Sequence, residues 1–425
     1  MDYENHDVCE KIINDIDAVF TKDPNVSTFE IIAVDESQTK NKTPVVHVDN
    51  HLGLESWCVH HVYRHAHQII LAAAKKYPQF SSNCDGNDSE NDPQRHFYQR
   101  PSTPPHPFDQ TLIKYLNCAL LINPDVTTFW NARRRLLQKD RLDIGKEFKF
   151  SAMVLSKKPK SNDTFCYRRW LYSFQSHESI DWFRELSLCE RCASKNLSNY
   201  QAWSHRQWVL QKAPFLLQYE LATTERFIRK HIGDYSGYYH RQFVLYKMNE
   251  VLFFEHEHEP HIESDFGQYS SLINYLASIG SMAAQNVQQK YCNPDNTTTP
   301  SLENGHYGDG SVDGTVAWMV LMKIIVPQRD FHINAIGMVS IDNSDKIRMK
   351  NFLYCMNVAA YDLKFVDELN EMFGYREAFK CHRRAIIQYM ADKCKEWSVE
   401  SNITNVITLT LQNMLQHSSN IALVR

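Results

Sequence analysis

The chain has 425 residues, of which 43% are hydrophobic, 12% aromatic and 23% charged, and its formal net charge is −4. This composition is that of a globular protein that can bury a large core. Because the chain is weakly acidic, it has no basic field to attract a phosphate backbone, and general nucleic-acid binding is not expected.

The acidic start of the chain, Met1 to Asn5, leads into no apolar segment, so we expect no secretory signal and a cytoplasmic location. The eleven cysteines are accordingly predicted to be reduced thiols. The most apolar stretch, Ala317 to Val326, is short and contains Lys323, so no membrane span is expected.

The chain order predicts five parts. They are an N-terminal segment (1–77), a proline-rich linker (78–110), four helical repeats (111–250), an insertion (251–360) and a fifth repeat with C-terminal helices (361–425). Residues 284–316 of the insertion contain four glycines and a polar threonine run, which predicts local disorder.

The repeats share one motif: an aromatic residue, two further positions, an arginine, and then a long apolar pair. The copies are Trp130 with Arg133, Phe165 with Arg168, Trp203 with Arg206, and Tyr238 with Arg241. The arginines are 35, 38 and 35 residues apart. This period is typical of helical hairpins that bury their apolar faces against neighbouring hairpins. We therefore predict an all-α fold, an α-solenoid of stacked helical hairpins.

Residues suited to helix capping precede each motif, so each motif is predicted to open the second helix of its hairpin. The predicted first helices are residues 112–122, 148–155, 183–193 and 217–232. A weaker fifth copy contains Lys380, in place of the aromatic residue, and Arg383, behind an amphipathic segment at 361–373.

The motif residues suggest structural roles first. A repeated aromatic residue in the first turn of a helix is predicted to pack across the junction between hairpins. For the repeated arginine we favour bonding between repeats, since its planar fork suits carboxylates and helix-end carbonyls. A surface that meets a partner or a phosphate is the alternative.

Three clusters of cysteine or histidine have spacings seen in metal sites. They are Cys189 with Cys192, His61 with His65, and the group His256, His258 and His261. A structural zinc ion needs four ligands, and no second CxxC pair follows the first. No acidic residue supports a zincin at the His61 helix, and the third cluster reads as a solvated charged loop. We predict no metal bound by this chain.

The segment Asn199–Trp208, with the sequence NYQAWSHRQW, resembles the repeat signature of protein prenyltransferase alpha subunits. The segments Pro44–Val48 and Gly53–Cys58 are similar to a divergent branch of that family. The resemblance covers about residues 44–70, 111–250 and 361–390. It implies a crescent-shaped superhelix that wraps around a separate beta subunit.

The resemblance also implies how the work is divided. The beta subunit, expected to be that of the Rab-type geranylgeranyltransferase, would supply the zinc ion and the isoprenoid pocket. The reaction would transfer geranylgeranyl from its diphosphate to a C-terminal cysteine of a protein of vesicle traffic. The repeat signature, implied to form the partner interface, comprises Trp130, Arg133, Phe165, Arg168, Trp203, His205, Arg206, Tyr238, His240, Arg241 and Arg383.

One residue of the family pattern carries chemistry, a lysine five residues before the second aromatic, and Lys160 occupies its position. In the family this lysine approaches the diphosphate; without the resemblance Lys160 reads as a solvated turn residue. Tyr200 matches a family tyrosine near the same site. Gln201 replaces the family's histidine and Asn162 a tyrosine, which leaves lipid and substrate preference open.

Two other classes of protein compete with this interpretation. A scaffold of tetratricopeptide type would bind a partner without catalysis, but its Trp-Leu-Gly-Tyr signature is missing from these copies. A helical-repeat RNA binder would need basic residues along one face, which the acidic balance does not suggest.

Overall fold

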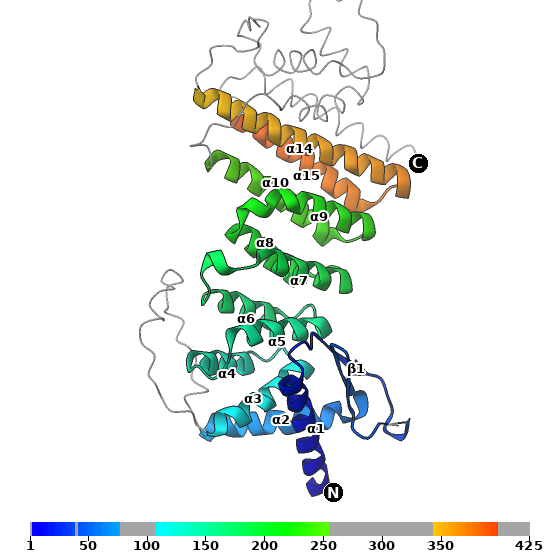
Figure 1. The fold of residues 1–425 in the computed structure, drawn as a ribbon. Coiled ribbons are helices and arrows are strands. Elements are labelled where there is room, and N and C mark those ends of the chain that lie inside the picture. Colours follow the sequence, from blue (N-terminus) through cyan, green and yellow to red (C-terminus); the bar gives the residue numbers. More distant parts are fainter. Residues whose placement is uncertain (1, 39–40, 77–106, 255–342, 398–425) are drawn as a thin grey trace, which may run out of the picture. The chain divides into compact units, whose positions relative to one another are not determined.

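The computed structural model describes residues 2–38, 41–76, 107–254 and 343–397 (Figure 1). The chain divides into two compact units, residues 1–212 and 213–425. The linker predicted at 78–110 is described only from Pro107 onward. The segment 284–316 and the cluster of His256, His258 and His261 lie outside the described residues.

The N-terminal part of the first unit contains a small sheet between two long helices. Its elements are α1 (Asp2–Lys22), β1 (Thr28–Ile32), β2 (Val45–Val48), β3 (His51–Glu55) and α2 (Ser56–Lys76). The strand order is β1-β3-β2, with β1 parallel and β2 antiparallel to the central strand. The strands β1 and β2 are rich in β-branched residues, which favour this conformation. The sheet is the exception to the all-α fold expected from the sequence.

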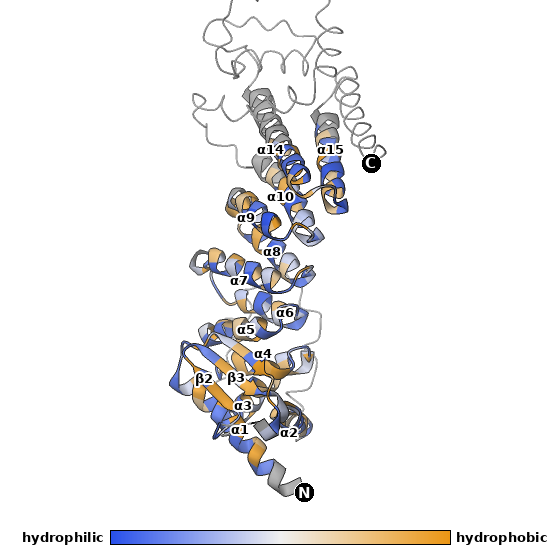
Figure 2. Ribbon diagram, turned by 90° about the vertical axis from the view of Figure 1, so that its right-hand side faces the viewer, coloured by the Kyte–Doolittle hydropathy of each residue, from blue (hydrophilic) through white to orange (hydrophobic). Residues whose placement is uncertain are grey.

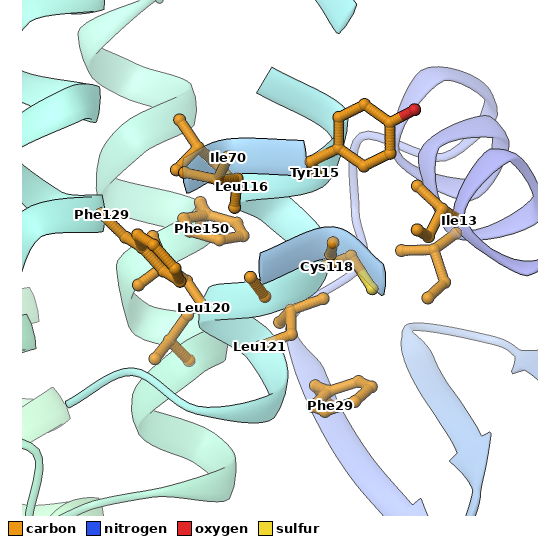
Figure 3. Packing of buried hydrophobic residues seen from close by; sticks show 14 of the residues in the cluster. Ile13, Phe29, Ile70, Tyr115, Leu116, Cys118, Leu120, Leu121, Phe129 and Phe150 are labelled. Carbon is orange, nitrogen blue, oxygen red and sulfur yellow. The ribbon is translucent and has the colours of Figure 1, made fainter. Parts of the chain in front are cut away.

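The sheet packs onto the first repeat helices through a shared apolar core (Figure 3). Phe29 of β1 and Ile13 of α1 are fully buried there with Leu116 and Leu121 of α3 (Pro107–Ile122). The backbone amide of Phe29 also donates to the Ser156 hydroxyl at 2.9 Å. The N-terminal part therefore covers the first end of the repeat array, as terminal caps of solenoids do.

A polar cluster joins α1, α2 and α3 beside this core. The Glu10 carboxylate accepts hydrogen bonds from the Tyr115 hydroxyl at 2.5 Å and from Lys114 Nζ at 3.2 Å, and lies 2.7 Å from His65 Nε2. These contacts together lower the pKa of Glu10 despite the opposing effect of burial. His65 thus has a structural partner, and His61 on the same helix is exposed.

Three helical hairpins complete the first unit. They pair α3 with α4 (Thr127–Gln138), α5 (Ile144–Lys157) with α6 (Asn162–Tyr172), and α7 (Trp182–Lys195) with α8 (Tyr200–Lys212). The side chains of Ser161 and Asn199 cap α6 and α8 by accepting from backbone amides three residues later. The predicted hairpins are confirmed, and in each of them the motif lies at the start of the second helix. Figure 2 shows hydrophobic and hydrophilic residues interleaved along these helices, as amphipathic packing requires.

The described residues of the second unit form two more hairpins. They pair α9 (Leu217–Lys230) with α10 (Tyr235–Phe254) and α14 (Asn343–Phe373) with α15 (Glu377–Trp397). The apolar residues Ile228, Tyr238 and Val366 join these helices in one core. The first helix of the last hairpin begins at Asn343, inside the range 251–360 assigned to the insertion.

The last hairpin keeps the predicted register, with Lys380 at the position of the motif's aromatic residue. Phe379 is fully buried against Tyr238, with ring centroids 6.1 Å apart, whereas Lys380 is only half-buried and lies over the Tyr375 ring. The buried ring of this repeat is therefore that of Phe379, one position before Lys380, while His382 lies twenty residues after Asp362 as His205 does after Glu185.

Candidate functional site

The repeated arginines lie buried at the junctions between hairpins. Arg133 Nε donates to Glu147 at 2.8 Å, and Arg168 Nε donates to Glu185 at 2.8 Å. Each carboxylate belongs to the first helix of the next hairpin, and each pair is bidentate. The favoured prediction, bonding between repeats, is confirmed for these two junctions.

The second unit repeats this arrangement across the insertion. Arg241 Nε and NH2 donate to Asp362 Oδ1 at 2.9 and 2.6 Å, although the two residues are 121 positions apart. Arg241 NH1 also donates to the Thr224 hydroxyl at 2.9 Å. The hairpin α14–α15 is therefore joined to α10 by the same contact that joins hairpins separated by a short loop.

Each of these acids, and Glu220 of α9, also lies close to a tyrosine or histidine on the second helix of its own hairpin, twenty residues later; all but Asp362 accept a hydrogen bond there. The distances are 2.7 Å from Glu147 to the Tyr167 hydroxyl, 2.6 Å from Glu185 to His205 Nε2, 2.7 Å from Glu220 to His240 Nε2 and 3.4 Å from Asp362 to His382 Nε2. We call these acids and their arginine, tyrosine and histidine partners the charge ladder. Sequence analysis missed the acids, and their spacing from the tyrosine or histidine was the available signal.

The electrostatics of the ladder follow from burial and pairing. Burial alone would raise the pKa of Glu185, but Arg168 and the hydrogen bond from His205 lower it well below its usual range. Burial lowers the pKa of His205, and the opposing effect of Glu185 does not restore it. Glu185 is therefore ionised and His205 neutral at pH 7, with the Nε2 proton donated to Glu185.

The motif residues are enclosed within the chain rather than displayed. Trp130, Arg133, Phe165, Arg168, Trp203, His205, Arg206, Tyr238, His240 and Arg241 are between 0% and 5% exposed. Core packing, predicted for the aromatic residues, is confirmed. The partner-interface role implied for the signature does not fit this burial, because side chains committed to neighbouring helices have no surface to offer. Arg383 is half-buried and pairs with Asp367 of its own hairpin.

The CxxC pair of α7 lies in the same interior. Cys189 and Cys192 are both buried, and burial raises the pKa of Cys192 to about 12. A thiol with so high a pKa is not readily available as a thiolate ligand. Among the residues that the structure describes, no group of three or more histidine, cysteine, aspartate or glutamate side chains could hold a metal ion.

The residues expected near the diphosphate lie at an exposed end of the hairpins. Lys160 is exposed in the loop between α5 and α6, and Tyr200, the first residue of α8, is 69% exposed. The Asn199 side chain donates to the carbonyl of Pro159 at 2.7 Å, which ties these two loops together. Gln201 is half-buried beside Tyr200. The structure therefore brings Lys160 and Tyr200 to one surface.

The lysines next to Lys160 are engaged elsewhere. Lys157 Nζ donates to the carbonyl of Ile122 at 2.5 Å, and burial, with a smaller effect of Lys158, lowers the pKa of Lys157 to about 8. Lys158 pairs with Asp125. The ammonium of Lys160 has no hydrogen bond or ion pair with any residue of the described part of the chain. Its charge is open to an external anion.

The repeat architecture and its charge ladder define an α-helical repeat protein. The family described as "Protein prenyltransferase alpha subunit repeat" matches residues 144–175, 182–213 and 217–248. These three matches correspond to the hairpins α5–α6, α7–α8 and α9–α10. The chain contains protein prenyltransferase alpha subunit repeats, as its resemblance implied.

Similar proteins carry two kinds of name. "Protein prenyltransferase alpha subunit repeat-containing protein 1" of Danio rerio is 29% identical over 223 residues, which are 48% of this chain and 46% of that protein. The Homo sapiens protein of the same name is 29% identical over 222 residues, 48% of each chain. "Geranylgeranyl transferase type-2 subunit alpha" of Sus scrofa is 32% identical over 125 residues, 27% of this chain and 21% of that protein.

The chain spans about half the length of the curated relatives it matches first, so the alignments concern the repeats rather than whole proteins. No helix within the described ranges combines the length and the apolar character that crossing a membrane requires.

Proposed function

We propose that the chain is the alpha subunit of a heterodimeric protein prenyltransferase. The observation that carries this proposal is the exposed, unpaired ammonium of Lys160 beside the exposed Tyr200, at the open end of matched alpha-subunit repeats. A buried ladder alone would serve any scaffold. A free cation at the position of the family's diphosphate lysine supports catalysis.

The remaining components of the enzyme are proposed to come from outside this chain. A beta subunit, of the Rab geranylgeranyltransferase type, would supply the zinc ion and the isoprenoid pocket. The similarity to a protein named "Geranylgeranyl transferase type-2 subunit alpha" supports geranylgeranyl diphosphate as the lipid donor. The acceptor would be the C-terminal cysteine of a vesicle-traffic protein.

The proposed reaction explains why a cation is useful. The cysteine sulfur forms a bond to C1 of the isoprenoid after its thiol proton is lost to solvent. The bond between C1 and the diphosphate oxygen breaks, and its electron pair leaves with the diphosphate. Negative charge therefore grows on the leaving group, and a fixed positive charge beside it stabilises the transition state more than the ground state. This is the role we propose for Lys160.

The test is transfer by the full chain co-expressed with candidate beta subunits, using labelled geranylgeranyl and farnesyl diphosphates. Lys160→Ala is expected to lower single-turnover transfer by about 10²–10³-fold, the usual effect of removing one group that stabilises developing charge. Lys146→Ala, which removes another exposed lysine of the same hairpin, is the matched control and should leave transfer unchanged.

Pairing with a beta subunit but no transfer by the unaltered chain would replace this proposal with the scaffold alternative. Equal transfer by Lys160→Ala and the unaltered chain would reduce Lys160 to a solvated turn residue.

A further inference from the structure

A second cation lies on the same surface, and sequence analysis did not single it out. Arg169 is half-buried on α6, directly after the ladder residue Arg168. Its NH1 lies 3.4 Å from His205 Nδ1 and its NH2 lies 3.1 Å from Cys166 Sγ. Within residues 107–254 it bonds to no carboxylate.

The ladder fixes the orientation of this guanidinium. His205 Nε2 lies 2.6 Å from Glu185, so the Nε2 proton is donated there and Nδ1 is left as an acceptor. Arg169 donates to that acceptor, which is fully buried and held by its own hydrogen bond. His205 and Cys166, the two partners of Arg169, are neutral groups. They position the positive charge without compensating it, which is the property of a preorganised anion ligand.

The spacing places Arg169 in line with Lys160. Asn162, Cys166 and Arg169 are four and three residues apart, so they share one face of α6. At about 1.5 Å of rise per residue, Asn162 and Arg169 are separated by about 10 Å along the helix. Lys160 stands just before the start of this face, so two long cationic side chains flank the short polar residues between them.

We propose that Arg169 is a second ligand of the lipid diphosphate and acts together with Lys160. This inference rests on the proposed function, since it assigns a residue to the same site. A guanidinium offers two parallel donors to phosphate oxygens, whereas an ammonium acts as a point charge. Arg169 then binds the diphosphate before and after the bond to C1 breaks, and Lys160 adds charge at the leaving oxygen.

The experiment uses the full chain in complex with its beta subunit and three variants. Arg169→Gln keeps a donor for His205 but removes the charge, and Arg169→Lys keeps the charge but loses the fork. Arg226→Gln is the matched control, because Arg226 is an exposed arginine that donates to the neutral hydroxyl of Thr223. The measurements are kcat/KM for geranylgeranyl diphosphate, the inhibition constant of inorganic pyrophosphate, and the thermal midpoint of the complex.

We expect Arg169→Gln to weaken inhibition by pyrophosphate and to lower kcat/KM, each by about 10–100-fold, as loss of a charged hydrogen-bond partner does. Arg169→Lys should recover part of this loss, and Arg226→Gln should match the unaltered complex. The thermal midpoint should move by the same small amount in all three.

Unchanged pyrophosphate inhibition in Arg169→Gln, while Lys160→Ala loses transfer, overturns the assignment of Arg169 and leaves the proposed function standing. A loss in Arg169→Gln that follows its thermal midpoint and is not recovered by Arg169→Lys also overturns it, in favour of structural support for His205. Absence of transfer by the unaltered chain with every beta subunit overturns both proposals.

Discussion

Removing one carboxylate from the charge ladder should lower the free energy of unfolding far more than removing one from the surface. Glu185 accepts from Arg168, from the Tyr172 hydroxyl at 2.7 Å and from His205, and its side chain is 1% exposed. Glu185→Leu leaves the guanidinium of Arg168 buried without its counter-charge. Breaking a buried pair in this way costs about 3–5 kcal/mol in the free energy of unfolding.

A surface pair of the same unit supplies the comparison. Asp125 and Lys158 form an ion pair whose side chains are 44% and 43% exposed. Water screens such a pair, so Asp125→Leu should cost at most about 1 kcal/mol.

A double variant distinguishes two causes of lower stability: the loss of the ion pair itself, and the burial of an arginine that has lost its carboxylate partner. Arg168→Met combined with Glu185→Leu removes both charges and fills the space with apolar groups. Pairs replaced in this way are often no less stable than the original pair. The double variant should therefore recover most of the stability that Glu185→Leu loses, less the hydrogen bonds of Tyr172 and His205.

The assay is hydrogen exchange under increasing urea, followed on peptides from α6, α7 and α8, because local exchange reports the opening of these helices directly. Glu185→Leu should open them at clearly lower urea than Asp125→Leu does. Equal shifts for the two single variants would refute the reasoning, as would a double variant less stable than Glu185→Leu.

Three further predictions concern single residues. Burial lowers the pKa of His205, so the unfolded chain binds a proton at this imidazole more tightly than the folded chain does. The free energy of unfolding should therefore fall as pH drops below about 6.5. His205→Gln should flatten this slope when urea unfolding is measured at decreasing pH. Phe379→Ala should cost about 3–5 kcal/mol and Lys380→Ala less than about 0.5 kcal/mol in the free energy of unfolding by urea, and similar costs would contradict the burial of Phe379. Competitive amine acylation should show Lys157 reacting with a midpoint near pH 8, and a midpoint near the ordinary value of about 10.4 would contradict its burial.

The sequence predicted the repeats well because their motif is local. An aromatic residue and an arginine three positions later fall on one helix, so a pattern search finds them without knowing the fold. Capping residues such as Ser161 and Asn199 marked where the second helices begin. The copy at Lys380 was weak because it has no aromatic residue at the motif position, and the buried ring of Phe379, one position earlier, lies outside the pattern.

The acids of the ladder were harder to predict because each connects three helices. Glu147 lies 14 residues after Arg133 and 20 before Tyr167, and neither interval belongs to a helical or strand period. The N-terminal sheet was missed for a related reason. Its strands are only four or five residues long, and β1 reaches its partner β3 after an excursion of about twenty residues. Contacts of this kind come from tertiary packing, which overrides local pattern.

The pairing of Arg241 with Asp362 also governs the order in which the second unit can assemble. In the first unit, the paired arginine and acid are 14 or 17 positions apart, whereas Arg241 and Asp362 are 121 positions apart. The longer interval corresponds to about three doublings of loop length. Closing the longer loop costs roughly 1.8 kcal/mol more in chain entropy. On the ribosome, residues 255–342 are made between α10 and α14, an interval of roughly 4–18 s at about 5–20 residues per second. During that interval the apolar side of α10 lacks its packing partners α14 and α15. The nascent chain should therefore depend on a chaperone most before Asn343 is made.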